Sequence, residues 1–410
     1  MRSAVLGTIV LSLVGVPACA ENATPPSDSA TAIGAPTLVE TVEAAAFTER
    51  LRTGKSECCG PGQLLLQLAG EPKCSVKVYR YGYRTIDARG KSAEAGGALM
   101  LPSGPVETCG GPRPVALYTH GTTFEREFDM TDGGKGADLN RWEWANTVAF
   151  YAARGYVVVA PNYVGYAGSS ADHHPYLNGE QQGRDVVDAF KAARSHFSAL
   201  GVKDAGKLFI TGYSQGGYVA MATQRIIQRD FSGDVKVTAV AAGAGPYALS
   251  NQLDTIFMGA AIPYGSFFMP LLMNGWQAAY GDLYSSPADA FAAPFSDHAA
   301  TALPSKLSIP DLVAMGHLPA NALFEAGSEP GPMNLGSLDP GLGLVFQGGF
   351  AASGYLIKTP YRKKVVDDIK NQPCNDPVRG LDATCKPTSS LRQAALRNDL
   401  RNFVPNVPLT

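Results

Sequence analysis

The stretch that decides the fold is KLFITGYSQGGYV, Lys207–Val219, because it places a serine between an apolar run and a helix. Leu208–Ile210 is short and apolar without helical spacing, which is typical of a parallel strand buried on both faces. Gln215 begins a segment whose apolar residues recur at helical spacing, at Val219, Ala222 and Ile226. The stretch therefore predicts a strand, a sharp turn carrying Ser214, and a helix.

Two glycines flank the predicted turn. Gly212 and Gly216 surround Ser214 in the order G-x-S-x-G, and glycine removes the collisions that so tight a turn creates. A chain with 45 glycines can produce this spacing by chance, so an ordinary glycine-rich turn is the alternative. The strand before the serine and the helix after it favour a nucleophile elbow, with the helix dipole aimed at the serine.

Length and composition indicate a globular protein with a sizeable core. The chain has 410 residues, 45 % of them hydrophobic and 17 % charged, which suits one large domain with an insertion, or two domains. Its formal net charge is -2, so it lacks the basic excess that a phosphate backbone attracts. We expect no nucleic-acid partner.

The first twenty residues have the pattern of an export signal. Arg2 precedes an apolar run over Ala4–Val16 that is too short to span a membrane. Two cleavage patterns remain open: ordinary secretion, or lipidation of Cys19 as in an outer-membrane lipoprotein. We expect a secreted or periplasmic protein, with membrane association only through a lipidated Cys19. Residues 21–74 then form an N-terminal extension whose first part, Glu21–Pro36, is a flexible tether.

Six cysteines follow the leader, and an even number in an exported chain predicts disulfides. Cys374 and Cys385 bracket a loop and are expected to pair. Three pairings remain open for the other four, which are Cys58, Cys59, Cys74 and Cys109. A zinc site with four cysteine ligands is the alternative, although the spacing matches no usual metal pattern. We expect neither a metal nor a cofactor.

Residues 75–250 alternate between strand and helix patterns. After a helical preface at Val39–Arg52, Ser75–Tyr79 and Gly97–Leu101 suit an antiparallel opening pair. Further strands are expected at Val115–Tyr118, Tyr156–Ala160 and Val235–Ala242, with helices at Trp144–Ala152 and Val186–Phe197. The pattern predicts an α/β fold with a mostly parallel sheet and helices on both faces.

Beyond residue 250 the alternation stops. Residues 251–400 are expected to form a mainly helical cap or lid over the site, and some of their apolar side chains must line a pocket. Residues 401–410 resemble the start of another core strand, at Val407–Leu409.

The elbow predicts acyl transfer. A serine attacks an acyl carbon when a base takes its proton, and two donors must stabilise the oxyanion that forms. We expect Ser214 to be the nucleophile, with the backbone N–H groups of Gln215 and Thr122 as the oxyanion donors.

The base is not evident from the sequence. In hydrolases of this kind an acid and then a histidine follow the serine, yet the only later histidines are His298 and His317, both in the cap region. Structural or surface roles are expected for the four earlier histidines, His120, His173, His174 and His196.

Three stretches resemble the secretory lipase (lipase A-like) family of α/β-hydrolases: Tyr83–Pro102, Pro161–Gly179 and Ile210–Ala220. The resemblance implies an exported carboxylic ester hydrolase (serine esterase or lipase), with Ser214 as nucleophile, an acyl ester or lipid as substrate, and no metal or cofactor.

The chain departs from that family after LRNDLRNFVPNVPLT, where the last core strands, the catalytic Asp and the His are missing. The expectation is a C-terminally truncated hydrolase, and whether the chain is active or inactive without these residues stays open. Two alternatives remain open: a peptide or polyester hydrolase on the same fold, and a catalytically dead ligand-binding protein.

Overall fold

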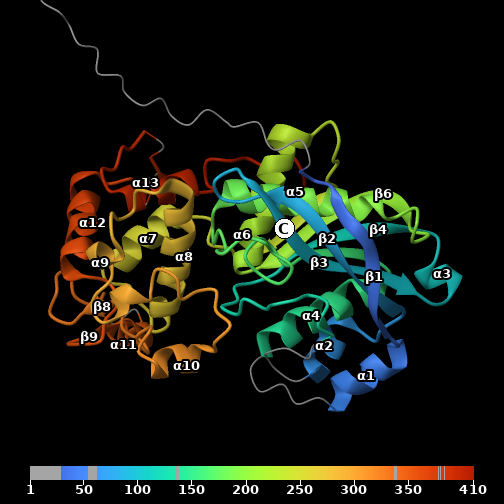
Figure 1. Cartoon of the computed structure of the whole chain (residues 1–410), viewed down its shortest axis with the longest axis horizontal. Helices are drawn as coiled ribbons and strands as arrows, with labels where there is room; N and C mark the ends of the chain where they lie inside the picture. The colour runs from blue at the N-terminus through green and yellow to red at the C-terminus, as the bar shows by residue number, and fades with distance from the viewer. Residues whose placement is uncertain are drawn as a thin grey trace, which may run out of the picture.

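A computed structural model describes residues 29–53, 62–133, 138–336, 339–376, 378, 380–382 and 384–410 (Figure 1). Its central sheet has seven strands in the order β1-β2-β3-β5-β4-β6-β7. The strands are β1 (Ala32–Val42), β2 (Ser75–Ile86), β3 (Ser92–Ser103), β4 (Pro112–Thr119), β5 (Val157–Pro161), β6 (Lys203–Tyr213) and β7 (Ala239–Gly243). β1, β2, β3 and β5 pair antiparallel, whereas β5, β4, β6 and β7 run parallel.

Helices cover both faces of the sheet, which explains why the parallel strands are so apolar. All five residues of β5 are buried, as is the second half of β4. α5 (Gly179–Ser195) and α6 (Gln215–Ile226) lie together on one face, and α4 (Asp138–Phe150) lies on the other, beside α1 (Ala44–Thr53) and α2 (Gly62–Ala69) (Figure 1). The predicted mostly parallel sheet is confirmed.

The N-terminal expectations need correction. The helix predicted over Val39–Arg52 is half wrong, because β1 continues to Val42 and α1 begins only at Ala44. The predicted tether, Glu21–Pro36, also extends too far, because residues 32–36 belong to β1. Residues 21–28 lie outside the described part of the chain. Both errors have one cause: β1 is an edge strand whose backbone partners are in β2, far along the sequence.

One predicted core strand is shorter than expected. The apolar run Val235–Ala242 becomes a strand only at Ala239, because Val235 N still donates to Phe231 O at the end of the preceding helical turn. β7 itself pairs with a later segment, since Val240 forms a parallel bridge with Leu409.

Residues after β7 form a mainly helical layer beside the sheet (Figure 1). Its helices are α7 (Leu249–Phe257), α8 (Gly265–Tyr280), α9 (Pro287–Ala290), α10 (Ile309–Ala314), α11 (Pro340–Gln347), α12 (Thr359–Asn371) and α13 (Ser390–Arg397). Two small two-stranded sheets, β8 (Phe324–Glu325) with β9 (Phe350–Ala351) and β10 (Asn375–Asp376) with β11 (Gly380–Leu381), complete it. We call this layer the cap.

Two disulfides cross-link the described residues. Cys374–Cys385 is the predicted pair, and Cys74–Cys109 joins the start of β2 to α3 (Val106–Cys109). The second bond removes two of the four thiolates that the zinc alternative requires; Cys58 and Cys59 lie outside the described residues.

The described residues hold no group of three or more metal-ligating side chains. None of their helices combines the length and the apolar character that a bilayer crossing requires. The predicted export signal and Cys19 fall within residues 1–28, outside the described part of the chain.

Candidate active site

Ser214 lies in the turn between β6 and α6, with φ +57° and ψ -124°. A non-glycine residue in this region is strained by about 1–3 kcal/mol, so the surrounding structure must hold it there. The flanking glycines explain how. A Cβ on Gly212 would stand 2.2 Å from Thr119 Oγ1, and a Cβ on Gly216 would stand 2.0 Å from Thr119 O. Only glycine lets the end of β4 approach the turn this closely.

The two proposed oxyanion donors lie at the carboxyl ends of neighbouring parallel strands. Gln215 is the first residue of α6, where a helix offers its own N–H groups no backbone partner. Thr122 lies in the loop that follows β4, and β4 pairs with β6. Thr119 Oγ1 donates 2.7 Å to Gly216 O, which fastens the end of β4 to the first turn of α6.

A buried glutamate supports the loop after β4. Glu143 of α4 accepts from Gly121 N at 2.8 Å and from the Tyr118 hydroxyl. Burial raises the pKa of Glu143 to about 7, although both hydrogen bonds oppose that shift. The pair of contacts fixes the backbone one residue before Thr122.

His120 is buried, and its side chain packs against the same loop. Its Nδ1 lies 2.8 Å from Gly121 O and its Nε2 lies 3.1 Å from Asn162 O, and its ring stacks on Tyr163 at 4.0 Å. Burial lowers the pKa of His120 to about 4, so the ring is neutral. With both nitrogens facing backbone oxygens, His120 has no nitrogen left for Ser214.

A cavity of about 320 Å³ opens beside Ser214 and Gln215, between the end of the sheet and the cap. Its lining is mainly apolar, and most of it comes from two cap helices. α7 contributes Leu249, Leu253 and Ile256, and α8 contributes Phe268, Met269 and Leu272. The sequence predicted that apolar side chains of the cap line a pocket, and the lining residues from the cap are mainly apolar. Sequence alone did not say which residues point inward.

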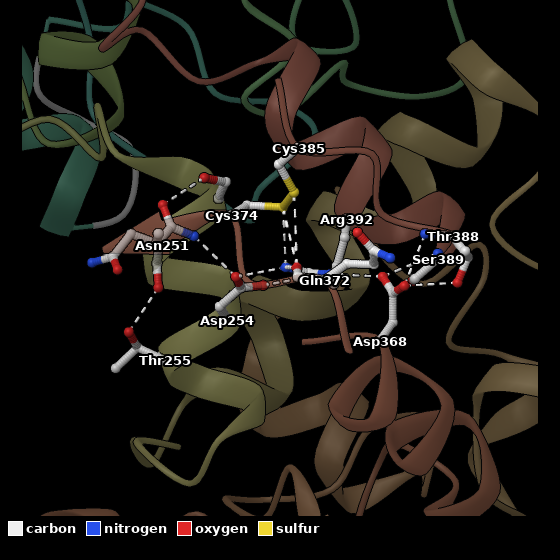
Figure 2. Close-up of polar contacts among 12 residues, drawn as sticks. Asn251, Asp254, Thr255, Asp368, Gln372, Cys374, Cys385, Thr388, Ser389 and Arg392 are labelled. Carbon is white, nitrogen blue, oxygen red and sulfur yellow. Dashed lines mark hydrogen bonds and ion pairs between the residues drawn. A yellow bond between two sulfur atoms is a disulfide. The ribbon is translucent and has the colours of Figure 1, made fainter. Parts of the chain in front are cut away.

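Arg392 of α13 anchors the wall formed by α7 (Figure 2). Its guanidinium donates 2.8 and 3.0 Å to the carboxylate of Asp254 in α7, and 2.8 Å to Asp368 in α12. It also donates to Gln372 O and to Cys374 Sγ of the Cys374–Cys385 disulfide. One buried cation therefore joins three cap helices and the disulfide.

The described residues bring no histidine to Ser214. His298 and His317 stack on each other, with ring centroids 3.9 Å apart, and neither lines the cavity. No described residue hydrogen-bonds to Ser214 Oγ, and no described His, Asp or Glu lines the cavity. Ser214 and Gln215 line the cavity together, whereas Thr122 is not among its lining residues, so the roles of these three residues stay predictions.

Sequence comparison connects the chain to lipases. A family model described as Secretory lipase matches residues 145–304, less than half of the chain. Lipase 6 of Candida albicans is 29 % identical over 134 residues, which is 31 % of this chain and 26 % of that protein. Lipase 10 of the same fungus is 27 % identical over a segment of equal length. The match thus spans about a quarter of the curated relatives' length.

Solved structures match nearly the whole chain. The rice cell wall degrading esterase LipA from Xanthomonas oryzae superposes with a TM-score of 0.69 at 23 % identity, covering 94 % of this chain and 82 % of that one. A putative hydrolase from Legionella pneumophila gives a TM-score of 0.65 at 17 % identity, covering 92 % and 82 %. These structures confirm the α/β-hydrolase fold, and the family model and the Candida lipases confirm the resemblance to secretory lipases.

Proposed function

We propose that this protein is an exported serine ester hydrolase that forms an acyl-enzyme at Ser214. The observation that carries the proposal is the position of Ser214: a strained elbow at the start of α6 that borders a mainly apolar cavity. The match to secretory lipases over residues 145–304, which includes the elbow, supports the same chemistry.

The proposed reaction assigns a role to each part of the site. Ser214 Oγ attacks the ester carbonyl carbon, and the N–H groups of Gln215 and Thr122 donate to the oxyanion of the tetrahedral intermediate. Collapse of that intermediate breaks the bond between the carbonyl carbon and the alcohol oxygen, and the alcohol leaves with the proton that Ser214 Oγ has lost. Water then adds to the acyl-enzyme, the acid leaves, and one proton of the water returns to Ser214 Oγ. The apolar walls of α7 and α8 would hold an acyl or alkyl chain, so acyl esters or lipids are the substrate class.

One observation favours a second candidate, a ligand-binding protein that does not turn its ligand over. No described histidine, aspartate or glutamate lines the cavity at Ser214, and general base catalysis by such a group typically contributes about 10²–10⁴-fold in rate. Such a protein would retain apolar acyl ligands in the same cavity without hydrolysing them.

A fluorophosphonate probe separates these two candidates. We expect stoichiometric labelling of the intact chain, read by mass, and no labelling of Ser214→Ala; parallel assays use nitrophenyl esters of increasing acyl length. Retention of a fatty acid that Ser214→Ala leaves unchanged, with no labelling of folded wild-type protein, would instead establish the binding protein.

Export is the remaining part of the proposal. Two disulfides among the described residues support an oxidising compartment, since thiols stay reduced in the cytoplasm. Whether Cys19 carries a lipid is decided by the mass of the mature N-terminal peptide. A diacylglyceryl adduct on Cys19 would mean a lipoprotein, and an unmodified peptide would mean ordinary secretion.

A further inference from the structure

The segment His174–Tyr176 contacts both proposed oxyanion residues, one through each of its end side chains. His174 Nε2 lies 2.8 Å from Gln215 Nε2, and the Tyr176 hydroxyl lies 2.8 Å from Thr122 Oγ1. Gln215 and Thr122 come from the ends of different strands, so this segment connects two loops that the sheet alone leaves separate.

The direction of the His174 contact follows from its other nitrogen. Nδ1 lies 2.8 Å from Val164 O, and a carbonyl oxygen can only accept, so Nδ1 carries the proton. Nε2 of the neutral ring is then an acceptor, and the Gln215 side-chain amide donates to it. Burial lowers the pKa of His174 to about 3, and Val164 O only partly opposes that shift, so the ring keeps this tautomer at working pH.

The Tyr176 contact places a hydroxyl on the other donor. Tyr176 is buried and lines the cavity beside Ser214. Burial raises the pKa of Tyr176 to about 12, so its phenol stays protonated at working pH and is able to donate to Thr122 Oγ1. That bond fixes the side chain, and thereby the backbone orientation, of Thr122.

The segment is itself held rigidly. Gly165 has a φ of +93°, and a Cβ there would stand 2.5 Å from His173 O and 2.6 Å from His174 N. On the cap side, a Cβ on Gly275 of α8 would stand 2.8 Å from His174 O and 2.9 Å from Tyr176 N. The segment is therefore packed between the loop after β5 and a helix that lines the cavity.

We propose that His174 and Tyr176 are positioning residues that set the distance and orientation between the Gln215 and Thr122 oxyanion donors. The inference rests on the proposed function, because it assigns a purpose to contacts around that site. In this role each side chain acts through the residue it holds, although Tyr176 also borders the cavity. Two donors must converge on one oxygen, so small displacements of either reduce the stabilisation of the intermediate.

Four variants test this inference. His174→Asn keeps a donor for Val164 O but loses the acceptor for Gln215, while His174→Gln keeps an acceptor that reaches Gln215. Tyr176→Phe removes the bond to Thr122. Tyr218→Phe is the matched control, because the buried Tyr218 hydroxyl lies 2.8 Å from Asn398 O and 3.1 Å from Leu177 O, next to the segment, and contacts neither donor.

With nitrophenyl esters we expect kcat to fall about tenfold in His174→Asn and in Tyr176→Phe, below the 10²–10³-fold cost of losing an oxyanion donor outright. KM should stay within about twofold, because ground-state binding does not use the oxyanion donors. His174→Gln should recover part of the loss, and Tyr218→Phe should retain wild-type kcat below its melting temperature. The inference would be overturned if kcat fell no further in His174→Asn and Tyr176→Phe than in Tyr218→Phe, or if only KM changed.

Nuclear magnetic resonance decides the same question for a protein that neither hydrolyses esters nor reacts with the probe, a result that defeats the proposed function by itself. We expect ¹⁵N shifts of His174 that show an unprotonated Nε2 and stay constant between pH 5 and pH 8. The backbone amide signal of Gln215 should move in His174→Asn, and that of Thr122 in Tyr176→Phe, while Tyr218→Phe leaves both in place. A His174 that titrates in this range, or amide signals that do not move, would refute the positioning role.

Discussion

Arg392→Met tests how the cap holds the wall of the Ser214 cavity. The Arg392 side chain is 2 % exposed, and it is paired with Asp254 and Asp368, whose side chains are 11 % and 4 % exposed. Methionine has a similar length but neither charge nor donors. The substitution therefore leaves two carboxylates inside the cap with no cation between them (Figure 2).

The structure sets the expected size of the effect. Removing one partner of a buried ion pair costs about 3–5 kcal/mol, because the charge left behind stays desolvated. Arg392→Lys keeps the charge, but one ammonium cannot reproduce the two bonds to Asp254 and the bond to Asp368. Since a hydrogen bond to a charged group contributes about 1.5–3 kcal/mol, we expect Arg392→Lys to lose about 2 kcal/mol.

Urea unfolding followed by tryptophan fluorescence measures these losses, with Trp276 of α8 reporting from the cap. Adding Asp254→Asn and Asp368→Asn to Arg392→Met should restore about half of the lost stability, because no uncompensated charge then remains. A loss below about 1 kcal/mol in Arg392→Met, or a triple variant no more stable than the single one, would refute the reasoning.

Lowering the pH should reduce the difference in the free energy of unfolding between Arg392→Met and the wild type. Burial raises the pKa of Asp368, but hydrogen bonds from Thr388, Arg392 and Ser389 outweigh it, and the net shift is downward. A carboxyl with a lowered folded pKa contributes stability above its unfolded pKa and loses it as pH falls through the folded value. The wild type therefore loses this contribution in acid, whereas Arg392→Met has little of it to lose.

Three further predictions concern the core, the elbow and the cavity. Burial raises the pKa of Asp185 to about 7, so wild-type stability should fall by up to about 1.4 kcal/mol per pH unit between pH 4 and pH 7; Asp185→Asn should flatten this slope in urea titrations. Gly216→Ala should prevent folding or cost more than about 3 kcal/mol, because its Cβ meets Thr119 O, whereas Gly233→Ala, with open space, should stay within about 0.5 kcal/mol in thermal melts. Ile256→Trp should fill the cavity and lower kcat/KM for long acyl esters relative to acetyl esters; an unchanged chain-length profile would place the acyl chain elsewhere.

The elbow was predictable because its causes are local. The apolar run, the two glycines and the start of the helix lie within Lys207–Val219, and their order favours an elbow over an ordinary glycine-rich turn. β1 was missed for the opposite reason: Leu38 and Val39 are about half exposed, and the strand is defined by its pairing with β2. The spacing of apolar residues alone does not distinguish an edge strand from one face of a helix.

Contacts made across the fold left no pattern in the sequence. Arg392 lies 138 residues from Asp254, and His174 lies 41 residues from Gln215. The sequence left a structural or a surface role open for His174, and the structure buries its side chain. The contact with Gln215 depends on how the loop after β5 folds. Spacing rules describe neighbours on one helix or strand, so pairs of this kind become visible only in three dimensions.

The strain at Ser214 bears on the choice between hydrolysis and binding. A serine at φ +57° costs about 1–3 kcal/mol relative to a relaxed turn, and the fold maintains it through glycines that no larger residue can replace. A cavity that only retained an apolar ligand would not need this turn, because its apolar walls come mainly from α7 and α8. In the proposed reaction the hydroxyl would lie beside two backbone donors, an arrangement that matters only when negative charge develops on a bound carbonyl oxygen. The strained serine therefore favours the proposed acyl transfer over retention of a ligand alone.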